Sequence, residues 1–281
     1  MTTTTLQAQL RGLQVREQVR EVRESAPVAA SSSSGSCAPD CSVCGGVGYV
    51  RYDVPVGHPK FGKVEMCPHA RRLAFERSLD DGSLDPRIGL RPDEVQSLHW
   101  GLIQDGISDG QKARSAAQSA HQTGHGVCFL YGKSGQAKTL ALKIAVATAL
   151  RDGKTAAYAN MLSVLDDIRL AFDARENKQT ELVRRMEWWQ SLDVLAIDEL
   201  DKVNSTDWAL ERMFQLIDAR YQRAVRQEAL TFIAANYGSS LNELSDYLRS
   251  RIEDNRFAVN GWVVYLNGPD GRKVMPPGWK Y

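Results

Sequence analysis

The sequence lacks any long apolar run. No stretch approaches the ~20 consecutive apolar residues that a membrane-spanning helix needs, and the N-terminal stretch MTTTTLQAQLRGLQVREQ contains no apolar signal core. Charge of one sign is not in excess either, because 35 Lys and Arg face 34 Asp and Glu. We therefore expect a cytoplasmic protein without a membrane contact, in which any contact with nucleic acid depends on a local basic patch.

Cysteine is scarce too, and its distribution is uneven. Five cysteines in 281 residues do not suggest a disulfide scaffold. Four of them fall between Cys37 and Cys67, which predicts a local site instead. The fifth, Cys128, lies in an apolar run and is most simply a small buried residue.

Composition changes along the chain and predicts four segments. Residues 1–36 contain a polar helix over residues 5–24 and a Ser-rich flexible linker. Residues 37–70 predict a zinc-binding module, and residues 71–125 a helical connector. In residues 126–281, short apolar runs alternate with longer helical patterns; the runs are VCFLY, TAAYA, DVLAID, ALTFIAAN and WVVYL. This alternation predicts an α/β fold with a five-stranded parallel sheet flanked by helices.

The stretch GKSGQAKT has the context of a phosphate-binding loop. It follows the strand-like run VCFLY and precedes LALKIAVATAL, a good helix. Small residues let backbone N–H groups wrap phosphates, a lysine reaches the outer phosphates, and a hydroxyl serves magnesium. We expect a nucleotide site whose residues include Gly132, Gly135, Gln136, Ala137, Lys138 and Thr139.

Ala137 stands where the loop pattern has glycine. This alanine costs little if its backbone is right-handed at the helix start, because only a positive φ penalises alanine heavily. The other reading is a glycine turn before a buried helix. The acidic pair after the run DVLAID favours the nucleotide site, since Asp198 can reach the magnesium shell and Glu199 can polarise the attacking water.

Two later features complete a hydrolytic constellation. Asn236 ends the run ALTFIAAN, where its amide can hold the water, although asparagine at a strand end is often only a turn former. The stretch YLRSRIEDNR supplies Arg249, Arg251 and Arg256. Such a cluster is explained if one arginine contacts the γ-phosphate of a nucleotide bound by a neighbouring subunit. The alternative is that the arginines form a solvated helix face.

Together the loop, VLAIDE, AAN and LRSRI resemble the AAA+ ATPases of the DnaC/DnaI helicase-loader and IstB group. The resemblance covers roughly residues 95–267, and the cysteine segment extends it toward loaders with a zinc-binding N-terminus. The sequence departs from the loop pattern by carrying Ala-Lys in place of Gly-Lys, and in this respect it looks similar to MCM and MoxR proteins. The chain after the arginine cluster is too short for a helical lid. The resemblance implies Lys138 and Thr139 in Walker A, Asp198 and Glu199 in Walker B, Asn236 as sensor 1, and Arg251 as arginine finger.

The resemblance also implies a DNA-facing helix after the second strand, in the stretch NMLSVLDDIRLAFDARENKQ. Arg169, Phe172 and Arg175 combine charge with an aromatic ring, as a track for single-stranded DNA does. In the alternative, Leu165, Ile168 and Phe172 form the buried stripe of an amphipathic helix.

The cysteine segment offers two pairs of soft ligands. Cys41 and Cys44 form a C-x-x-C knuckle, and Cys67 and His69 form a second pair, with a β-hairpin between them that includes the strand GYVRYDV. Four such ligands suit a closed, structural Zn²⁺ site. Because a C-x-H pair is unusual, Cys37 is the first substitute for one ligand and His58 a distant one. Reduced cysteines without a metal are the alternative.

The sequence therefore predicts ATP-dependent loading of a replicative ring helicase onto single-stranded DNA, with ATP, Mg²⁺ and Zn²⁺ as cofactors. The resemblance alone implies the helicase as partner, and the arginine finger implies self-association. Two alternatives remain. One is an IstB-type transposition helper that binds duplex DNA and a transposase; the zinc segment and the long N-terminal linker argue against it. The other is a non-hydrolysing, nucleotide-gated adaptor; Glu199 and Asn236 argue against it.

Overall fold

The computed structural model describes residues 37–56, 61–106, 108–173, 177–203, 206–239, 241, 244–258 and 260–274. The chain divides into two compact units, Met1–Glu76 and Arg77–Tyr281. The helix expected over residues 5–24 lies outside the described residues, as do His58 and Arg175.

The first unit contains the expected hairpin. Strand β1 (Tyr49–Arg51) pairs antiparallel with β2 (Val64–Met66), and helix α2 (Pro68–Asp80) begins directly after it. The first strand is shorter than the stretch GYVRYDV predicted. Val50 and Met66 pack against a cluster of buried cysteines, which is the core of this unit.

The second unit is built on a sheet of five parallel strands, as the sequence predicted. The strand order is β4-β5-β6-β3-β7. Three of the strands are buried along their whole length, which explains why they read as continuous apolar runs. The bounds are Gly126–Gly132 for β3, Ala156–Asn160 for β4, Val194–Asp198 for β5, Leu230–Ala235 for β6 and Val263–Leu266 for β7.

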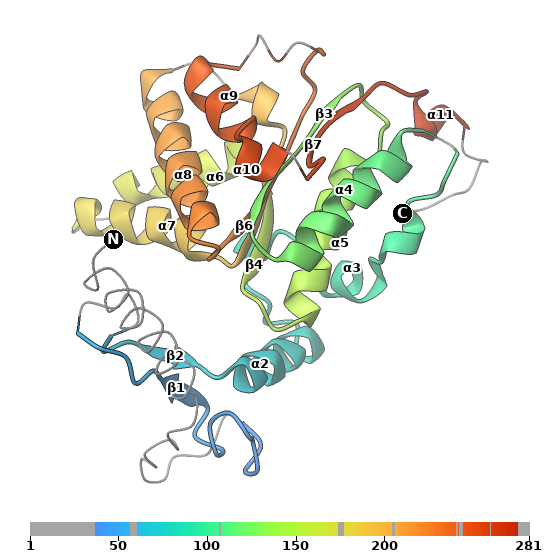
Figure 1. Ribbon diagram of the computed structural model, residues 1–281. Coiled ribbons are helices and arrows are strands. Elements are labelled where there is room, and N and C mark those ends of the chain that lie inside the picture. Colours follow the sequence, from blue (N-terminus) through green and yellow to red (C-terminus); the bar gives the residue numbers. More distant parts are fainter. Residues whose placement is uncertain are drawn as a thin grey trace, which may run out of the picture. The chain divides into compact units, whose positions relative to one another are not determined.

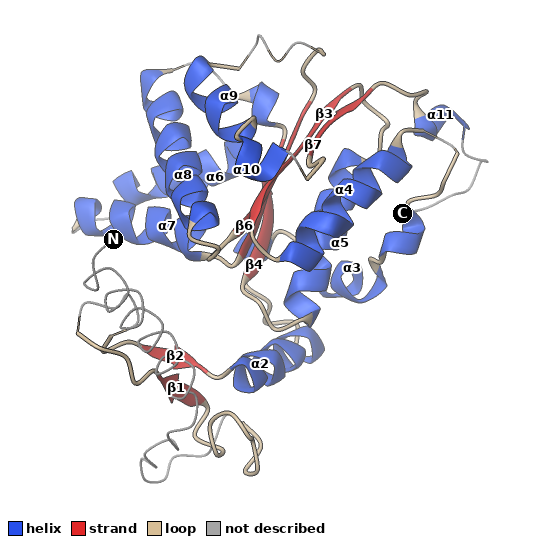
Figure 2. Cartoon of the chain, in the orientation of Figure 1, coloured by secondary structure: helices blue, strands red, loops and turns tan. Residues whose placement is uncertain are grey.

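Helices cover both faces of this sheet (Figures 1 and 2). One face carries α4 (Gly110–Thr123) and α5 (Lys138–Arg151), with α3 (Pro92–Ser97) against α5. The other carries α6 (Met161–Arg169), α7 (Lys178–Ser191), α8 (Asp207–Val225) and α9 (Asp246–Ile252). The short elements are η1 (Pro86–Ile88), η2 (Trp100–Leu102), η3 (Leu170–Asp173), η4 (Leu200–Lys202), α10 (Asn255–Ala258) and α11 (Gly271–Val274).

Strand register brings the sequence motifs to one edge of the sheet. Tyr131, just before the phosphate loop, lies opposite Ala235, and Asn160 lies opposite Asp198. Since all strands run parallel, their carboxyl ends meet at this edge, where ligands bind in open α/β sheets. Among the helices that the structure describes, none combines the length and the apolar character needed to cross a membrane.

Candidate functional site

The phosphate loop connects β3 to α5 and is closely packed at two glycines. Gly132 and Gly135 have φ angles of 124° and 78°. A Cβ at Gly132 would lie 2.0 Å from the carbonyl oxygen of Leu266, and one at Gly135 would lie 1.8 Å from Asp270 Oδ1. Both positions therefore admit only glycine, as expected of a loop that wraps an anion with backbone N–H groups.

Ala137 differs from the expectation. Its backbone has φ 58° and ψ 18°, which is the left-handed conformation and not the right-handed one that we expected. For a residue with a Cβ this conformation costs roughly 1–2 kcal/mol. The condition for an unstrained alanine is therefore not met, because the loop turns sharply at this residue to enter α5.

Lys138 and Thr139 begin α5 and make polar contacts within the site. Lys138 Nζ donates to the carbonyl oxygens of Gly132 at 2.8 Å and Lys133 at 2.7 Å. Burial lowers the pKa of this lysine, while nearby aspartates act in the opposite direction. Thr139 Oγ1 donates to Asp198 Oδ2 at 2.6 Å. The structure thus brings together the lysine, the hydroxyl and the carboxylate that the sequence assigned to one site.

The polar contacts of the site converge on Asp198, which ends β5 and is only 4% exposed. Besides the threonine hydroxyl, it accepts from the backbone N–H of Glu199 at 2.8 Å and from the Tyr158 hydroxyl at 3.0 Å. Burial first, and the negative charge of Asp198 next, raise the pKa of the Tyr158 phenol. We did not identify Tyr158 from the sequence. A tyrosine within a strand gives no signal, since only the pairing of β4 with β5 brings it close to Asp198.

Glu199 and Asn236 lie just beyond the ends of β5 and β6. Glu199 is exposed and has a φ of 53°. Such left-handed residues carry strain and cluster at functional sites. Asn236 is fixed by Asp201, whose carboxylate accepts from the asparagine backbone N–H at 2.9 Å and from Nδ2 at 3.4 Å. Both residues line the same cavity as the phosphate loop.

This cavity has a volume of about 640 Å³, within the range of small-ligand sites. One side consists of the phosphate loop and the acidic and amide residues described above. The other walls come from α3, η2 and α11, which the sequence did not connect with the site. Leu98 and Leu102 add apolar surface there, and Arg272 adds positive charge.

Gln136 lines the cavity, and its side chain also connects the phosphate loop to other parts of the chain. The side chain is 1% exposed, and its amide bonds to neighbouring backbone. Oε1 accepts from the N–H of Asp109 at 3.0 Å, and Nε2 donates to the carbonyl oxygens of Gly268 and Pro269, both at 2.9 Å. These bonds fix the loop to two other parts of the chain.

The arginine cluster does not line the cavity. Arg251, on α9, donates from Nε and Nη2 to Asp218 Oδ1 at 2.9 and 2.6 Å. Its guanidinium also lies 3.5 Å from the centre of the Tyr247 ring. Within one chain this arginine therefore serves α8–α9 packing, and a phosphate contact requires a second subunit.

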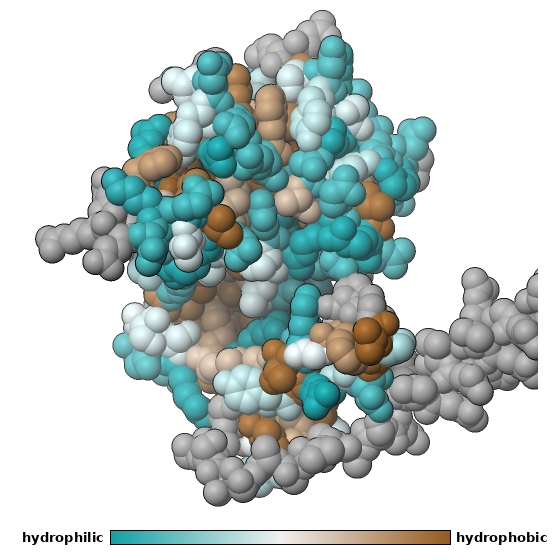
Figure 3. Space-filling view, turned by 90° about the vertical axis from the view of Figure 1, so that its left-hand side faces the viewer, coloured by the Kyte–Doolittle hydropathy of each residue, from teal (hydrophilic) through white to brown (hydrophobic). Residues whose placement is uncertain are grey.

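The helix expected to face DNA presents a mixed surface. Leu165 and Ile168 are buried, whereas Phe172 is 44% exposed. The Phe172 ring lies 6.1 Å from the ring of Trp208, and the Arg169 guanidinium lies 4.9 Å from the same indole. Phe172 therefore does not belong to the buried stripe, and Trp208 is a neighbour that the sequence did not reveal. Figure 3, seen from the side of α7 and α8, shows a mostly hydrophilic surface with separate hydrophobic spots.

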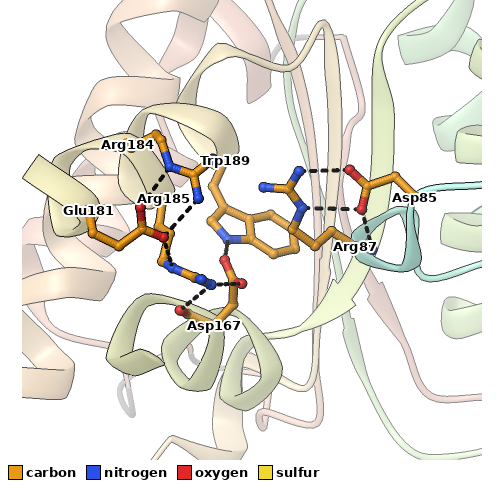
Figure 4. A network of polar contacts seen from close by, with 7 residues as sticks. All are labelled: Asp85, Arg87, Asp167, Glu181, Arg184, Arg185 and Trp189. Atoms are coloured by element: carbon orange, nitrogen blue, oxygen red, sulfur yellow. Dashed lines mark hydrogen bonds and ion pairs between the residues drawn. The ribbon is translucent and has the colours of Figure 1, made fainter. Parts of the chain in front are cut away.

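A polar network fixes this helix to the next one (Figure 4). Arg185 of α7 contacts Asp167 and Glu181, both at 2.6 Å. Trp189 Nε1 donates to Asp167 Oδ2 at 2.9 Å. The network thus holds the end of α6, next to Arg169 and Phe172, against α7.

The cysteine cluster contains four thiols. Their sulfur atoms all lie within 4.8 Å of one another, and the sulfurs of Cys41 and Cys67 are 3.8 Å apart. Tetrahedral Zn²⁺ with Zn–S bonds of about 2.3 Å requires sulfur atoms roughly 3.8 Å apart, so the donor set fits this ion. The members are Cys37, Cys41, Cys44 and Cys67.

His69, one of the predicted ligands, is not a member of this group of four. Cys37 completes the group of four in its place, as the first substitute that the sequence suggested. Nδ1 of His69 lies 3.1 Å from Cys41 Sγ, and this hydrogen bond is the main cause that lowers the pKa of the Cys41 thiol to about 5. His69 therefore supports a ligand from outside the tetrad. The reason is that α2 begins at Pro68 and carries the imidazole to the side of the cluster.

Comparison with known proteins gives similarities of fold. No family model and no curated protein matches the sequence. Among solved structures, replication initiator DnaA bound to AMPPCP and single-stranded DNA is 16% identical, with a TM-score of 0.48, over 61% of this chain and 49% of that one. The DnaC helicase loader is 17% identical, with a TM-score of 0.43, over 62% and 98%. DnaI is 12% identical, with a TM-score of 0.45, over 64% and 95%.

The match spans about half the length of the DnaA chain. At these identities the similarities concern the fold alone. The order of the five parallel strands and the phosphate loop between β3 and α5 are observations on this chain itself. By these features it has the fold of the AAA+ ATPases, preceded by a four-cysteine module.

Proposed function

We propose that this protein binds and hydrolyses ATP. The observation that carries the proposal is the contact between Thr139 and Asp198 at the floor of the cavity. A hydroxyl and a carboxylate held together beside a phosphate loop are the ligands that Mg²⁺ uses with nucleotide phosphates. Leu98 and Leu102 supply an apolar wall for the base.

The roles of the other residues follow from their positions. Backbone N–H groups of the loop bind the phosphates, and Lys138 exchanges its bonds to loop carbonyls for bonds to the outer phosphates. Thr139 and Asp198 would hold Mg²⁺, which would supply positive charge to balance the phosphates. Glu199 accepts a proton from the attacking water, and Asn236, fixed by Asp201, orients that water.

We propose further that ATP turnover serves to load a ring-shaped replicative helicase onto single-stranded DNA. The sequence resemblance to the DnaC/DnaI group supports this assignment. The exposed ring of Phe172 and the half-buried ring of Trp208, with Arg169 beside them, add a surface suited to unpaired bases. In this proposal Arg251 leaves Asp218 to complete the site of a neighbouring subunit.

The cysteine module is proposed to hold one structural Zn²⁺ through Cys37, Cys41, Cys44 and Cys67. Four thiolates leave no open position, so the metal stabilises the hairpin and takes no part in catalysis. Together with the N-terminal segment, the module is the proposed docking element for the helicase.

The test is the ATPase rate of the pure protein, measured alone and with single-stranded DNA, duplex DNA or the replicative helicase of the same source. Stimulation by single strands and a change in rate with the helicase support loading. Stimulation by duplex DNA alone supports a transposition helper. Nucleotide binding without turnover under every condition contradicts hydrolysis and leaves a nucleotide-gated adaptor, a role to which the strained Ala137 would contribute.

A further inference from the structure

The wall of the cavity formed by α3 contains an ion pair that joins this helix to α5. Lys143 Nζ donates to Glu94 Oε1 at 2.9 Å, and the backbone N–H of Arg91 donates to the second oxygen, Oε2, at 3.0 Å. The side chains of Lys143 and Glu94 are 27% and 20% exposed, so the pair is partly shielded from water. Lys143 lies one helical turn after Thr139 on α5, and both residues line the cavity. The ion pair is therefore a neighbour of the proposed metal ligands.

The same lysine lies over the ring of Tyr158. Its Nζ is 5.3 Å from the ring centroid, which is within the distance at which a cation is attracted to the face of an aromatic ring. The hydroxyl of this tyrosine donates to Asp198 Oδ2 at 3.0 Å, and Thr139 Oγ1 donates to the same oxygen at 2.6 Å. One aromatic side chain therefore connects the ion pair of α3 and α5 to the carboxylate at the end of β5.

The backbone before α3 also approaches Tyr158. Gly89, which follows η1, has a φ of 72°, and a Cβ at this position would lie 1.8 Å from the carbonyl oxygen of Tyr158 and 3.6 Å from its ring atom Cδ1. Only glycine permits so close an approach in this conformation. Residues 89–94 therefore contact Tyr158 directly at Gly89 and, through Lys143, at Glu94.

Resting on the proposed nucleotide site, we propose that Glu94 and Lys143 are positioning residues, which hold the Tyr158 ring so that its hydroxyl fixes Asp198 for metal binding. Carboxylates that bind a metal are oriented by hydrogen bonds from outer partners, and loss of such a partner lowers the affinity for the metal. Without Lys143 the ring loses the contact on its face, and without Glu94 the lysine loses the carboxylate that keeps it there. Metal affinity thus depends on α3, a helix outside both the phosphate loop and the acidic motif.

Two other roles for the ion pair make different predictions. If the two charges act on the metal directly, removal of the positive Lys143 strengthens metal binding, whereas removal of the negative Glu94 weakens it. If the pair only packs α3 against α5, its loss lowers the melting temperature and leaves metal affinity unchanged. The positioning role alone predicts that both losses weaken metal binding and that the effect requires the hydroxyl of Tyr158.

The experiment measures binding of Mn²⁺, a spectroscopic substitute for Mg²⁺, to the full chain with a saturating non-hydrolysable ATP analogue, by electron paramagnetic resonance. Glu94→Gln and Lys143→Met should each raise the Mn²⁺ dissociation constant about threefold. Lys143→Arg, which keeps a cation for both the ring and the carboxylate, should restore most of the affinity. In a chain that carries Tyr158→Phe, the addition of Lys143→Met should cause no further change. Glu228→Gln, which breaks an ion pair with Arg226 just before β6 begins, is the matched control and should leave Mn²⁺ binding unchanged.

Two results overturn the inference: unchanged or tighter Mn²⁺ binding in Lys143→Met, or a loss of affinity in Lys143→Met that persists beside Tyr158→Phe. Melting temperatures verify that each variant folds, and Lys143→Gln takes the place of Lys143→Met if that variant does not. Asp198→Asn separates this inference from the proposed function. If Asp198→Asn abolishes Mn²⁺ binding while Glu94→Gln and Lys143→Met leave it unchanged, the metal–nucleotide site stands and the positioning role fails. If the unaltered protein with the analogue binds no Mn²⁺, the site itself fails, and the positioning role fails with it.

Discussion

The hydroxyl of Thr139 donates to the carboxylate of Asp198 across 2.6 Å, although the two residues are 59 positions apart in the chain. The contact joins the start of α5 to the end of β5 and fixes where a metal-bound phosphate would lie. Glu199, the proposed general base, follows Asp198 directly in the chain.

Replacing Glu199 by Gln should separate ATP binding from hydrolysis. The amide keeps the shape of the side chain but cannot take a proton, so the hydrolysis rate should fall about 100-fold or more. ATP affinity, measured by titration, should remain. Glu211→Gln, at an exposed site on α8, is the matched control. Unchanged turnover in Glu199→Gln removes this residue from the mechanism.

Replacing Ala137 by Gly should stabilise the protein. Glycine adopts the observed φ of 58° without the Cβ penalty, so the free energy of unfolding should rise by about 1 kcal/mol and the melting temperature by about 2–4 °C. Ala219→Gly, within the right-handed helix α8, should instead lose about 1 kcal/mol. Calorimetry of both variants is the measurement. A lower melting temperature in Ala137→Gly would show that the backbone of Ala137 is not strained.

Replacing Tyr158 by Phe should weaken the use of Mg²⁺. The variant loses the hydroxyl that bonds to Asp198, and one such hydrogen bond contributes about 1 kcal/mol. The Mg²⁺ concentration for half-maximal ATPase should therefore rise about fivefold. Tyr265→Phe, on the edge strand β7, tests whether any tyrosine of the sheet has this effect. Equal Mg²⁺ dependence in both variants would leave Tyr158 a packing residue.

Zinc content should depend on Cys37 and not on His69. Native mass measurement should show one Zn²⁺ per chain, lost in Cys37→Ser because only three thiols remain. His69→Ala should keep the metal but release it faster to a chelator, since a hydrogen bond to Cys41 is gone. Zinc retained in Cys37→Ser and lost in His69→Ala would instead identify the histidine as the fourth ligand. A metal-free native protein would remove the zinc site.

Single-stranded DNA should bind less well after removal of either ring of the Phe172–Trp208 pair. Phe172→Ala and Trp208→Ala should each weaken binding about tenfold, because base stacking contributes roughly 1–3 kcal/mol per base. Val183→Ala removes an exposed apolar side chain from α7 without touching these rings and should have no effect. Fluorescence anisotropy with an oligonucleotide measures all three. Equal affinity throughout would place the DNA contact elsewhere.

The sequence by itself determined the sheet, the phosphate loop and the acidic motif at the end of β5. Apolar runs that alternate with helical patterns specify parallel strands, and Gly132, Gly135 and Lys138 stand at spacings that a strand–loop–helix unit imposes locally. Asp198 is the last residue of its strand, so its place at the carboxyl edge of the sheet follows from the direction of the chain alone.

Tertiary structure decided the rest. Tyr158 reaches Asp198 only because β4 pairs with β5, and Arg272 reaches the cavity only because residues 267–272 return to the phosphate loop after β7. The four buried thiols, Cys37 among them, come together without His69, and Phe172 on η3 is exposed. The left-handed backbone of Ala137 is set by the turn into α5. Each depends on contacts between residues far apart in the chain or on backbone angles, neither of which residue spacing records.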